Sequence, residues 1–163
     1  SKVKSMPGRL ESINVGHKFT ALVDYAHTPD AVERVIATVK SATNGKIIGV
    51  LGCGGDRDAS KRLLMGHALF NGCDLAVFTS DNPRSESAEA ILKEMTRGLD
   101  LGNKGFIEID RKSAIDLAVK NAQSGDVVLL MGKGHESGQE VNAVVTPFDD
   151  RVELAESIKR LAR

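Results

Sequence analysis

The sequence predicts an α/β fold, with a doubly wound, mostly parallel sheet covered by helices on both faces. Short apolar runs typical of strands alternate at least four times with apolar residues at helical spacing. The runs 46–51, 75–79 and 127–131 each lead into a polar or glycine-rich loop. A length of 163 residues is enough for one domain with a buried core. In such sheets, ligands bind beyond the carboxyl ends of the strands.

The elements follow from local signals. Thr28 is a suitable cap and Pro29 suits the first turn of a helix, which Asn44-Gly45 ends. A turn at Gly16-His17 predicts an N-terminal hairpin. The predicted strands are 10–15, 19–25, 46–51, 75–79, 106–109, 127–131 and a further, antiparallel strand at 140–145. The predicted helices begin near residues 28, 60, 87, 114 and 149, the last with a cap at Asp149 or Asp150.

Composition excludes several classes of function. Lys+Arg and Asp+Glu both number 22, so net charge does not draw the chain to nucleic acid or to an anionic membrane. The absence of Trp and the single Tyr argue against base-stacking surfaces. Cys53 and Cys73 form no CxxC pair, and no apolar run has membrane-spanning length. We expect a cytoplasmic protein without nucleic-acid or membrane partners. Residues 1–8 resemble a linker, which suggests a part of a longer chain.

Four loops that follow predicted strands carry the chemical groups, at 24–30, 52–58, 80–86 and 132–138. Because parallel strands end at one edge of a sheet, these loops can form a single site. In the third loop, Pro83 fixes its own φ and restrains Asn82. Asp81, Asn82 and Arg84 then offer groups suited to a small zwitterion. The alternative is an Asn-Pro turn with solvated ends.

The other three loops are open to two interpretations each. Asp24, Tyr25 and His27 could contact a ribose or phosphate, or they could be a helix cap and surface residues. Arg57 stands where a dinucleotide fingerprint needs its third glycine, and Lys61 and Arg62 follow shortly after it. These cations favour carboxylate or phosphate recognition over dinucleotide binding at loop 52–58, and the alternative is a tight turn. Loop 132–138 is not a P-loop, and a turn that presents Glu136 to an amine is favoured over a metal site.

Taken together, the motifs DYAHTPD, GCGGDRD, TSDNPRSE, GDVVLLMGKGHE and PFDDR closely resemble the C-terminal domain of Mur ligases, especially the UDP-N-acetylmuramoyl-tripeptide synthetase type. The resemblance runs from residue 9 to residue 163. It implies a Rossmann-like, mostly parallel sheet with one antiparallel strand. It also implies a three-domain enzyme, whose first domain binds UDP-muramoyl-dipeptide and whose central domain binds ATP through a P-loop. Mg²⁺ is held partly by a carbamylated lysine of the central domain. The third domain brings the incoming amino acid, so this piece alone is expected to catalyse nothing.

The resemblance also implies a substrate. The DNPR sequence is the family's signature for addition of meso-diaminopimelate, whose extra carboxylate Arg84 would bind. Glu136 would face the terminal ammonium. The implied meso-diaminopimelate residues are Arg57, Asp81, Asn82, Pro83, Arg84, Gly132 and Glu136. Asp24, Tyr25 and His27 would face ATP, and no catalytic residue or metal ligand is assigned to this chain.

Two departures from the family pattern and several alternatives stand beside this assignment. Ser87-Ala88 replaces the usual Asp-Pro, and Ser137-Gly138 stands where an aromatic residue is usual before Gln139. The same loop would serve a ligase that adds lanthionine, and a lysine-adding relative is a further alternative. A non-catalytic module that binds an amino acid or a nucleotide is the alternative from another class. A nicotinamide-dependent oxidoreductase is disfavoured by Arg57.

Overall fold

The computed structural model describes residues 9–162, so the predicted linker at 1–8 lies outside the described residues. The main sheet has six strands in the order β1-β2-β6-β3-β4-β5. Only β1 is antiparallel, to β2, and every other pair is parallel. The strands are β1 Glu11–Ser12, β2 Thr20–Asp24, β3 Ile47–Leu51, β4 Leu75–Phe78, β5 Gly105–Ile107 and β6 Val127–Met131. The predicted α/β sheet with one antiparallel strand and an N-terminal hairpin is thus confirmed, although β1 is shorter than predicted.

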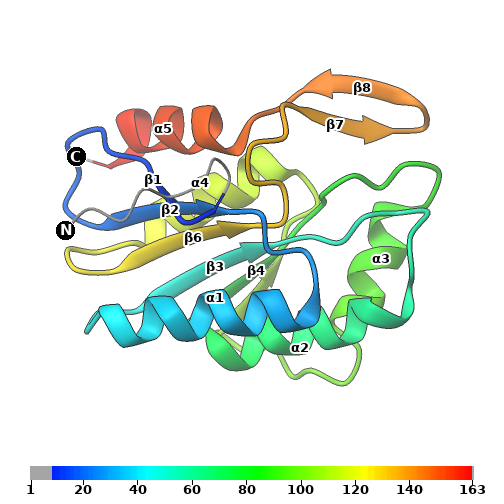
Figure 1. Ribbon diagram of the computed structural model, residues 1–163, viewed down its shortest axis with the longest axis horizontal. Coiled ribbons are helices and arrows are strands. Elements are labelled where there is room, and N and C mark those ends of the chain that lie inside the picture. The colour runs from blue at the N-terminus through cyan, green and yellow to red at the C-terminus, as the bar shows by residue number, and fades with distance from the viewer. Residues whose placement is uncertain (1–8, 163) are drawn as a thin grey trace.

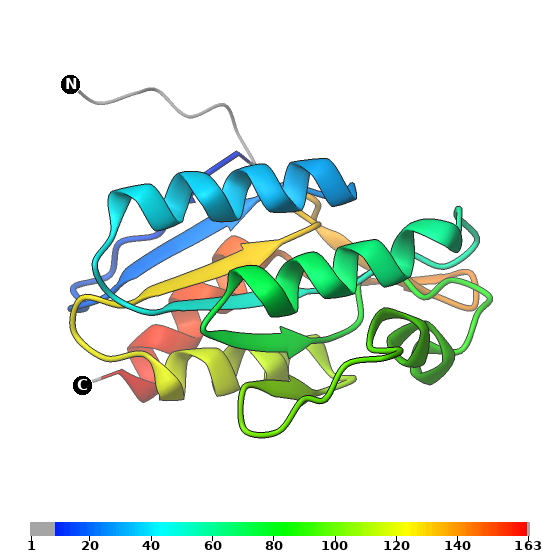
Figure 2. The same ribbon diagram turned by 90° about the horizontal axis from the view of Figure 1, so that it is seen from below.

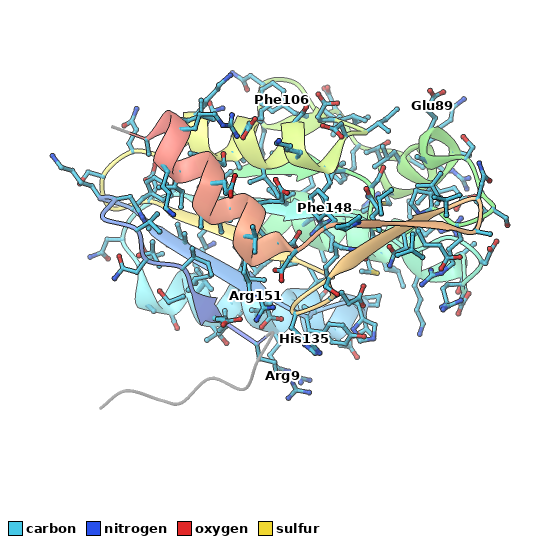
Figure 3. All side chains as sticks on the ribbon, turned by 90° about the horizontal axis from the view of Figure 1, so that it is seen from above. Arg9, Glu89, Phe106, His135, Phe148 and Arg151 are labelled. Carbon is cyan, nitrogen blue, oxygen red and sulfur yellow. The ribbon has the colours of Figure 1, made fainter. Side chains whose placement is uncertain are left out.

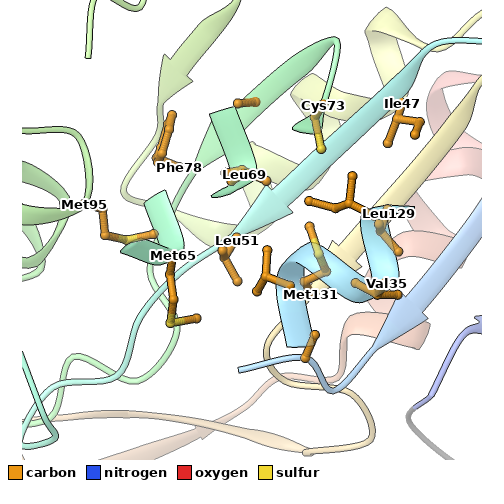
Figure 4. Packing of buried hydrophobic residues seen from close by; sticks show 14 of the residues in the cluster. Val35, Ile47, Leu51, Met65, Leu69, Cys73, Phe78, Met95, Leu129 and Met131 are labelled. Carbon is orange, nitrogen blue, oxygen red and sulfur yellow. The ribbon is translucent and has the colours of Figure 1, made fainter. Parts of the chain in front are cut away.

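Helices cover both faces of this sheet, as Figures 1 and 2 show. The helices are α1 Pro29–Ala42, α2 Ser60–Gly72, α3 Ala88–Met95, α4 Arg111–Asn121 and α5 Asp150–Leu161. One core cluster packs α1, α2 and α3 against one face, and the second packs α4 and α5 against the other. Figure 4 shows part of the first cluster, which includes Leu51 of β3, Met131 of β6 and the α2 residues Met65 and Leu69. Such a two-sided core explains why the central strands are apolar throughout.

Helix starts agree with the predicted caps. Thr28 Oγ1 accepts a hydrogen bond from Ala31 N at 3.2 Å, and Pro29 occupies the first turn. Ser87 Oγ accepts from Ala90 N, and Asp149 accepts from Arg151 N. Helix α3 ends at Met95, before Leu99, although Leu99 still packs against the core. The caps therefore fix where each chain segment leaves its loop.

The predicted strand at 140–145 is wrong. The segment forms a separate hairpin of β7 Gly138–Val141 and β8 Val144–Pro147, which projects beyond the carboxyl ends of the main strands (Figure 1). Asn142 and Ala143 form its turn with φ values of 49° and 64°. This conformation is typical of two-residue hairpin turns, but an alanine is uncommon there, so the sequence carried no clear turn signal.

One buried ion pair connects the loops at the carboxyl edge of the sheet. Arg111 and Asp150, the first residues of α4 and α5, have fully buried side chains. Arg111 Nε and Nη2 donate to the two Asp150 oxygens at 2.8 and 2.6 Å. The same guanidinium donates to Ser80 O and Met131 O, both at 3.1 Å. The loops that follow β4 and β6 are therefore held to each other and to α5 through one side chain.

We predict that Arg111→Met destabilises the fold by about 3–5 kcal/mol, because it leaves the Asp150 carboxylate buried without a partner. Urea unfolding measures this as a lower midpoint. The double variant Arg111→Met, Asp150→Leu should recover most of the loss, since no lone charge stays buried. Lys112→Met, at the exposed neighbouring position, should leave the midpoint unchanged. A single variant as stable as the double variant contradicts the role of the pair.

Candidate functional site

The four loops predicted to share an edge do meet, around a cavity of about 450 Å³. They follow β2, β6, β3 and β4, which are consecutive and parallel in the sheet. Eight of the ten predicted site residues line the cavity: Tyr25, His27, Arg57, Asp81, Asn82, Arg84, Gly132 and Glu136. Asp24 and Pro83 are not among the lining residues. The strand order therefore places these candidate residues around one cavity.

Arg84 is held from both its backbone and its side chain. Its φ is 54°, and its backbone bridges to β7 through Arg84 N to Glu140 O at 3.0 Å and Asn142 N to Arg84 O at 2.8 Å. Its Nη1 donates to Gly55 O at 2.9 Å, and its Nε lies 3.8 Å from a Glu140 oxygen. Nη2 donates no hydrogen bond to any other described residue. The guanidinium is thus fixed in place with donors to spare.

Loop 52–58 docks directly onto loop 80–86. Gly55 N donates to Asn82 O at 2.7 Å, and a side chain at position 55 would collide with the Pro83 carbonyl. The Asp56 carboxylate accepts from Ser85 Oγ at 2.5 Å and Ser85 N at 3.2 Å, and these bonds lower the pKa of Asp56. The close packing of the two loops therefore explains why position 55 is a glycine. Pro83 is buried, and its carbonyl lies against Gly55 at this contact.

Arg62 has a role that the sequence did not indicate. The sequence suggested that Arg62, with Arg57 and Lys61, recognises carboxylate or phosphate groups of a ligand. Instead, its buried guanidinium binds Glu86 at 2.6 Å, Glu94 at 2.8 Å and Gly54 O at 3.1 Å. The hydrogen bonds that Arg62 donates to the Glu86 carboxylate are the main reason that the pKa of Arg62 is raised. Arg57 and Lys61 remain as exposed cations on the cavity wall.

A polar cluster at the other side of the cavity combines carboxylates and one buried lysine. Asp81 is buried, and burial raises its pKa although the cations of Arg111 and Lys133 oppose this shift. Asp81 Oδ1 has no hydrogen-bond partner among the described residues. Lys133 Nζ lies 3.5 Å from Asp81 Oδ1 and 3.7 Å from Glu136 Oε1. The sequence pointed to Glu136 in this turn but gave Lys133 no role.

Gly132 brings this cluster together. Its φ of 108° is unfavourable for residues with side chains, and a Cβ there would lie 3.2 Å from Asp81 Oδ2. The chain can therefore turn sharply at the end of β6 and pass close to the Asp81 carboxylate. Gly132 thus shapes the site through its backbone.

Aromatic rings gather where loop 24–30 meets loop 132–138. The Tyr25 ring lies 4.5 Å from the His27 ring and 6.1 Å from the His135 ring, measured between centroids. His135 is exposed on the loop after β6 (Figure 3). Asp24 has a different role, because its two carboxylate oxygens accept from Leu10 N at 2.8 Å and Ala26 N at 2.7 Å. Asp24 therefore stabilises the turn before α1, whereas the cap of that helix is Thr28.

The remaining features of the described residues concern metal binding, the two cysteines and membrane spanning. In residues 9–162, no group of three or more His, Cys, Asp or Glu side chains is arranged to hold a metal ion. Burial raises the pKa of both Cys53 and Cys73 to about 12. Both thiols are free and buried, and Cys53 lines the cavity beside Met65. No helix in the described part of the chain is long and apolar enough to cross a membrane.

Comparison with known proteins places this geometry in a family. The model of the family "Mur ligase, glutamate ligase domain" matches residues 8–134. The UDP-N-acetylmuramoyl-L-alanyl-D-glutamate–2,6-diaminopimelate ligase of Streptomyces coelicolor is 50% identical over 163 residues, which cover 97% of this chain and 32% of that protein. The protein of the same name from Geobacillus thermodenitrificans is 47% identical over 160 residues, which cover 98% of this chain and 33% of that protein. The chain thus spans about a third of the length of these curated relatives.

Solved structures agree with the family match. A structure described as a UDP-N-acetylmuramoyl-L-alanyl-D-glutamate–2,6-diaminopimelate ligase superposes with a TM-score of 0.89 at 42% identity, covering 97% of this chain and 32% of that one. A folylpolyglutamate synthase of Mycobacterium tuberculosis shares the fold, with a TM-score of 0.59 at 19% identity over 98% of this chain and 33% of that one. The chain therefore belongs to the family of the Mur ligase, glutamate ligase domain.

Proposed function

We propose that this chain is the amino-acid-docking domain of an ATP-dependent ligase that adds meso-diaminopimelate to UDP-N-acetylmuramoyl-L-Ala-D-Glu during peptidoglycan precursor synthesis. The observation that carries the proposal is the convergence of Arg84, Arg57, Asp81 and Glu136 on one cavity. The names of the relatives support the same reaction. In this proposal residues 9–163 are the docking domain, residues 1–8 are a linker, and the isolated domain is inactive. The reaction uses ATP and a nucleotide-linked substrate, so we propose a cytoplasmic location.

The charges in the cavity suit an amino acid with two charged ends. Arg84 and Arg57 offer guanidinium groups, which bind carboxylates through paired hydrogen bonds. Asp81 and Glu136 offer acceptors for an ammonium group. Lysine has no carboxylate at its far end and would leave the guanidinium of Arg84 without a partner. Lanthionine carries both charged groups at each end, so this charge argument alone does not separate it from meso-diaminopimelate.

The aromatic cluster of Tyr25, His27 and His135 is the face that we propose turns toward ATP. Rings at the rim of the cavity are suited to contact with a nucleotide. Asp24 contributes by holding the turn that carries Tyr25, since its carboxylate is bonded to backbone N–H groups. ATP supplies the phosphoryl group that activates the acceptor carboxylate. We propose that ATP and Mg²⁺ are bound mainly by other domains of the ligase, and we assign no Mg²⁺ ligand here.

We predict that the complete ligase binds meso-diaminopimelate at least about 30-fold more tightly than L-lysine, the effect of one charged hydrogen-bonded pair. Isothermal titration calorimetry with the nucleotide substrates present measures both dissociation constants. Titration with lanthionine in the same series decides between the two amino acids that have charged groups at both ends. A preference for lysine would show that the proposed specificity is wrong.

We predict that Arg84→Ala lowers kcat/KM for meso-diaminopimelate by roughly 30- to 1,000-fold, which corresponds to about 2–4 kcal/mol for one charged partner. Steady-state kinetics at saturating ATP measure the change. Arg97→Ala removes an exposed arginine outside the cavity and should leave kcat/KM unchanged. Because Arg84 also donates to Gly55 O, thermal unfolding of each variant separates loss of the contact from loss of the fold. A fall below threefold in a folded Arg84→Ala variant would rule out the proposed contact.

A further inference from the structure

Lys133 is a completely buried charge that the proposed substrate contacts do not use. Its side chain has no exposed surface, and it is among the largest fully buried side chains. It lies in the turn after β6, between Gly132 and Glu136, and contacts loop 80–86. An ammonium group taken out of water is unfavourable unless several acceptors surround it. The acceptors that surround Lys133 therefore indicate what this residue does.

Four acceptors surround the Lys133 ammonium. Nζ donates to Gly138 O at 2.7 Å and to Asn82 Oδ1 at 3.3 Å. The oxygens of Asp81 and Glu136 lie at 3.5 and 3.7 Å. An ammonium has three protons, so it cannot satisfy all four acceptors at once. The carbonyl and the amide are the closer partners, which leaves acceptor capacity on both carboxylates.

The side-chain amide of Asn82 can face only one way beside this ammonium. Its Oδ1 accepts from Lys133 Nζ and from Glu140 N, at 3.3 and 2.9 Å. Its Nδ2 consequently faces Glu136 and donates to Oε1 at 3.3 Å. A flipped amide would bring its NH₂ group against two other donors. Lys133 therefore helps, together with Glu140 N, to set the direction of Asn82 and, through it, the position of the Glu136 carboxylate.

The charge balance of this cluster points to its ligand. One buried ammonium faces two carboxylates, so the cluster keeps an excess of negative charge when both carboxylates are ionised. Asp81 Oδ1 is buried with no hydrogen bond to any described residue. A single ammonium group from a ligand, bound where Asp81 and Glu136 line the cavity, would supply the missing positive charge.

We propose that Lys133 is a positioning residue, which orients Asn82 and Glu136 and leaves the Asp81–Glu136 pair ready for one ammonium group of the incoming amino acid. This inference rests on the proposed function and deepens it. Lys133 itself need not touch the amino acid, because it acts through the two side chains that do.

The test is a double-mutant cycle in the complete ligase, read as kcat/KM for meso-diaminopimelate at saturating ATP. We expect Lys133→Met to lower kcat/KM by at least about 10-fold in the wild-type background, as loss of a charged hydrogen bond does. In the Asn82→Ala background, the same change should cost less than threefold, since the residue on which Lys133 acts is already gone. KM for ATP should stay unchanged in both backgrounds. Lys112→Met, an exposed lysine on α4, is the matched control and should behave as wild type.

Two results would overturn the inference: a folded Lys133→Met variant within threefold of wild type, or an equal loss in both backgrounds. The second result would mean that Lys133 is only structural. A wild-type enzyme that does not prefer meso-diaminopimelate to lysine would instead contradict the proposed function.

A second pair of variants replaces the first comparison if Lys133→Met alone does not fold. Removing both members of a buried ion pair is tolerated better than removing one, so Asp81→Asn is compared with Asp81→Asn, Lys133→Met. The added lysine change should lower kcat/KM by at least about 10-fold relative to Asp81→Asn alone, because Asn82 still loses its orientation. No further loss would show that Lys133 has no positioning role.

Discussion

The buried ion pair between Arg111 and Asp150 is the interaction on which the site depends most. A pair with no exposed side-chain surface contributes little net stability by itself, since desolvation offsets much of the attraction. Its effect is geometric. The guanidinium also donates to the backbone carbonyls of Ser80 and Met131, which immediately precede the site residues Asp81 and Gly132. Two loops that are far apart in the sequence are thereby held at fixed separation at the edge of the sheet.

A second set of contacts fixes the loops at their outer ends. The Asp56–Ser85 bonds join loop 52–58 to loop 80–86, and Arg62 joins both to α3 through Glu86 and Glu94. The Arg84–Val141 bridge adds β7 to the same assembly. A ligand that enters this cavity meets side chains that are already oriented, so less conformational entropy is lost on binding. Contacts within the chain thus position the loops before any ligand binds.

Much of this architecture was predictable from the sequence, because the signals were local. The alternation of apolar patterns, the Thr28 cap and the polar loops after strands gave the fold class and the edge where the loops meet. The order of strands was not predictable in this way, since the central position of β6 comes from long-range pairing with β2 along one edge and β3 along the other. The turn at Asn142 and Ala143 was missed because positive φ at alanine leaves no sequence signal.

The roles of individual side chains were likewise predictable only where they depend on position in a loop and not on distant partners. Loop membership identified eight residues that line the cavity, yet the assignments of Asp24 and Arg62 needed partners to be known. From the sequence alone Arg62 is predicted to bind a ligand, but in the structure it is paired with Glu86 and Glu94, which lie more than twenty residues away in the sequence. The sequence indicates only that Lys133 belongs to a glycine-rich turn, whereas the structure shows four acceptors around its ammonium group. A sequence motif gives the residue types at an edge but not which of their charges are already paired.

The pairing pattern also explains how the cavity keeps opposite charges apart. Arg84 could bind Asp81 or Glu136 directly, which would remove the charges that a ligand needs. Instead its guanidinium is held by the Gly55 carbonyl and by Glu140, while Lys133 lies beside the two cavity carboxylates. The Gly55 carbonyl orients the guanidinium without cancelling its charge, and the Glu140 carboxylate is partly exposed and lies 3.8 Å from Nε, so Arg84 keeps donors for a further carboxylate. A site with separated charges favours a ligand whose own charges are separated to match, and the amino acid that we propose, with charged groups at both ends, meets that condition.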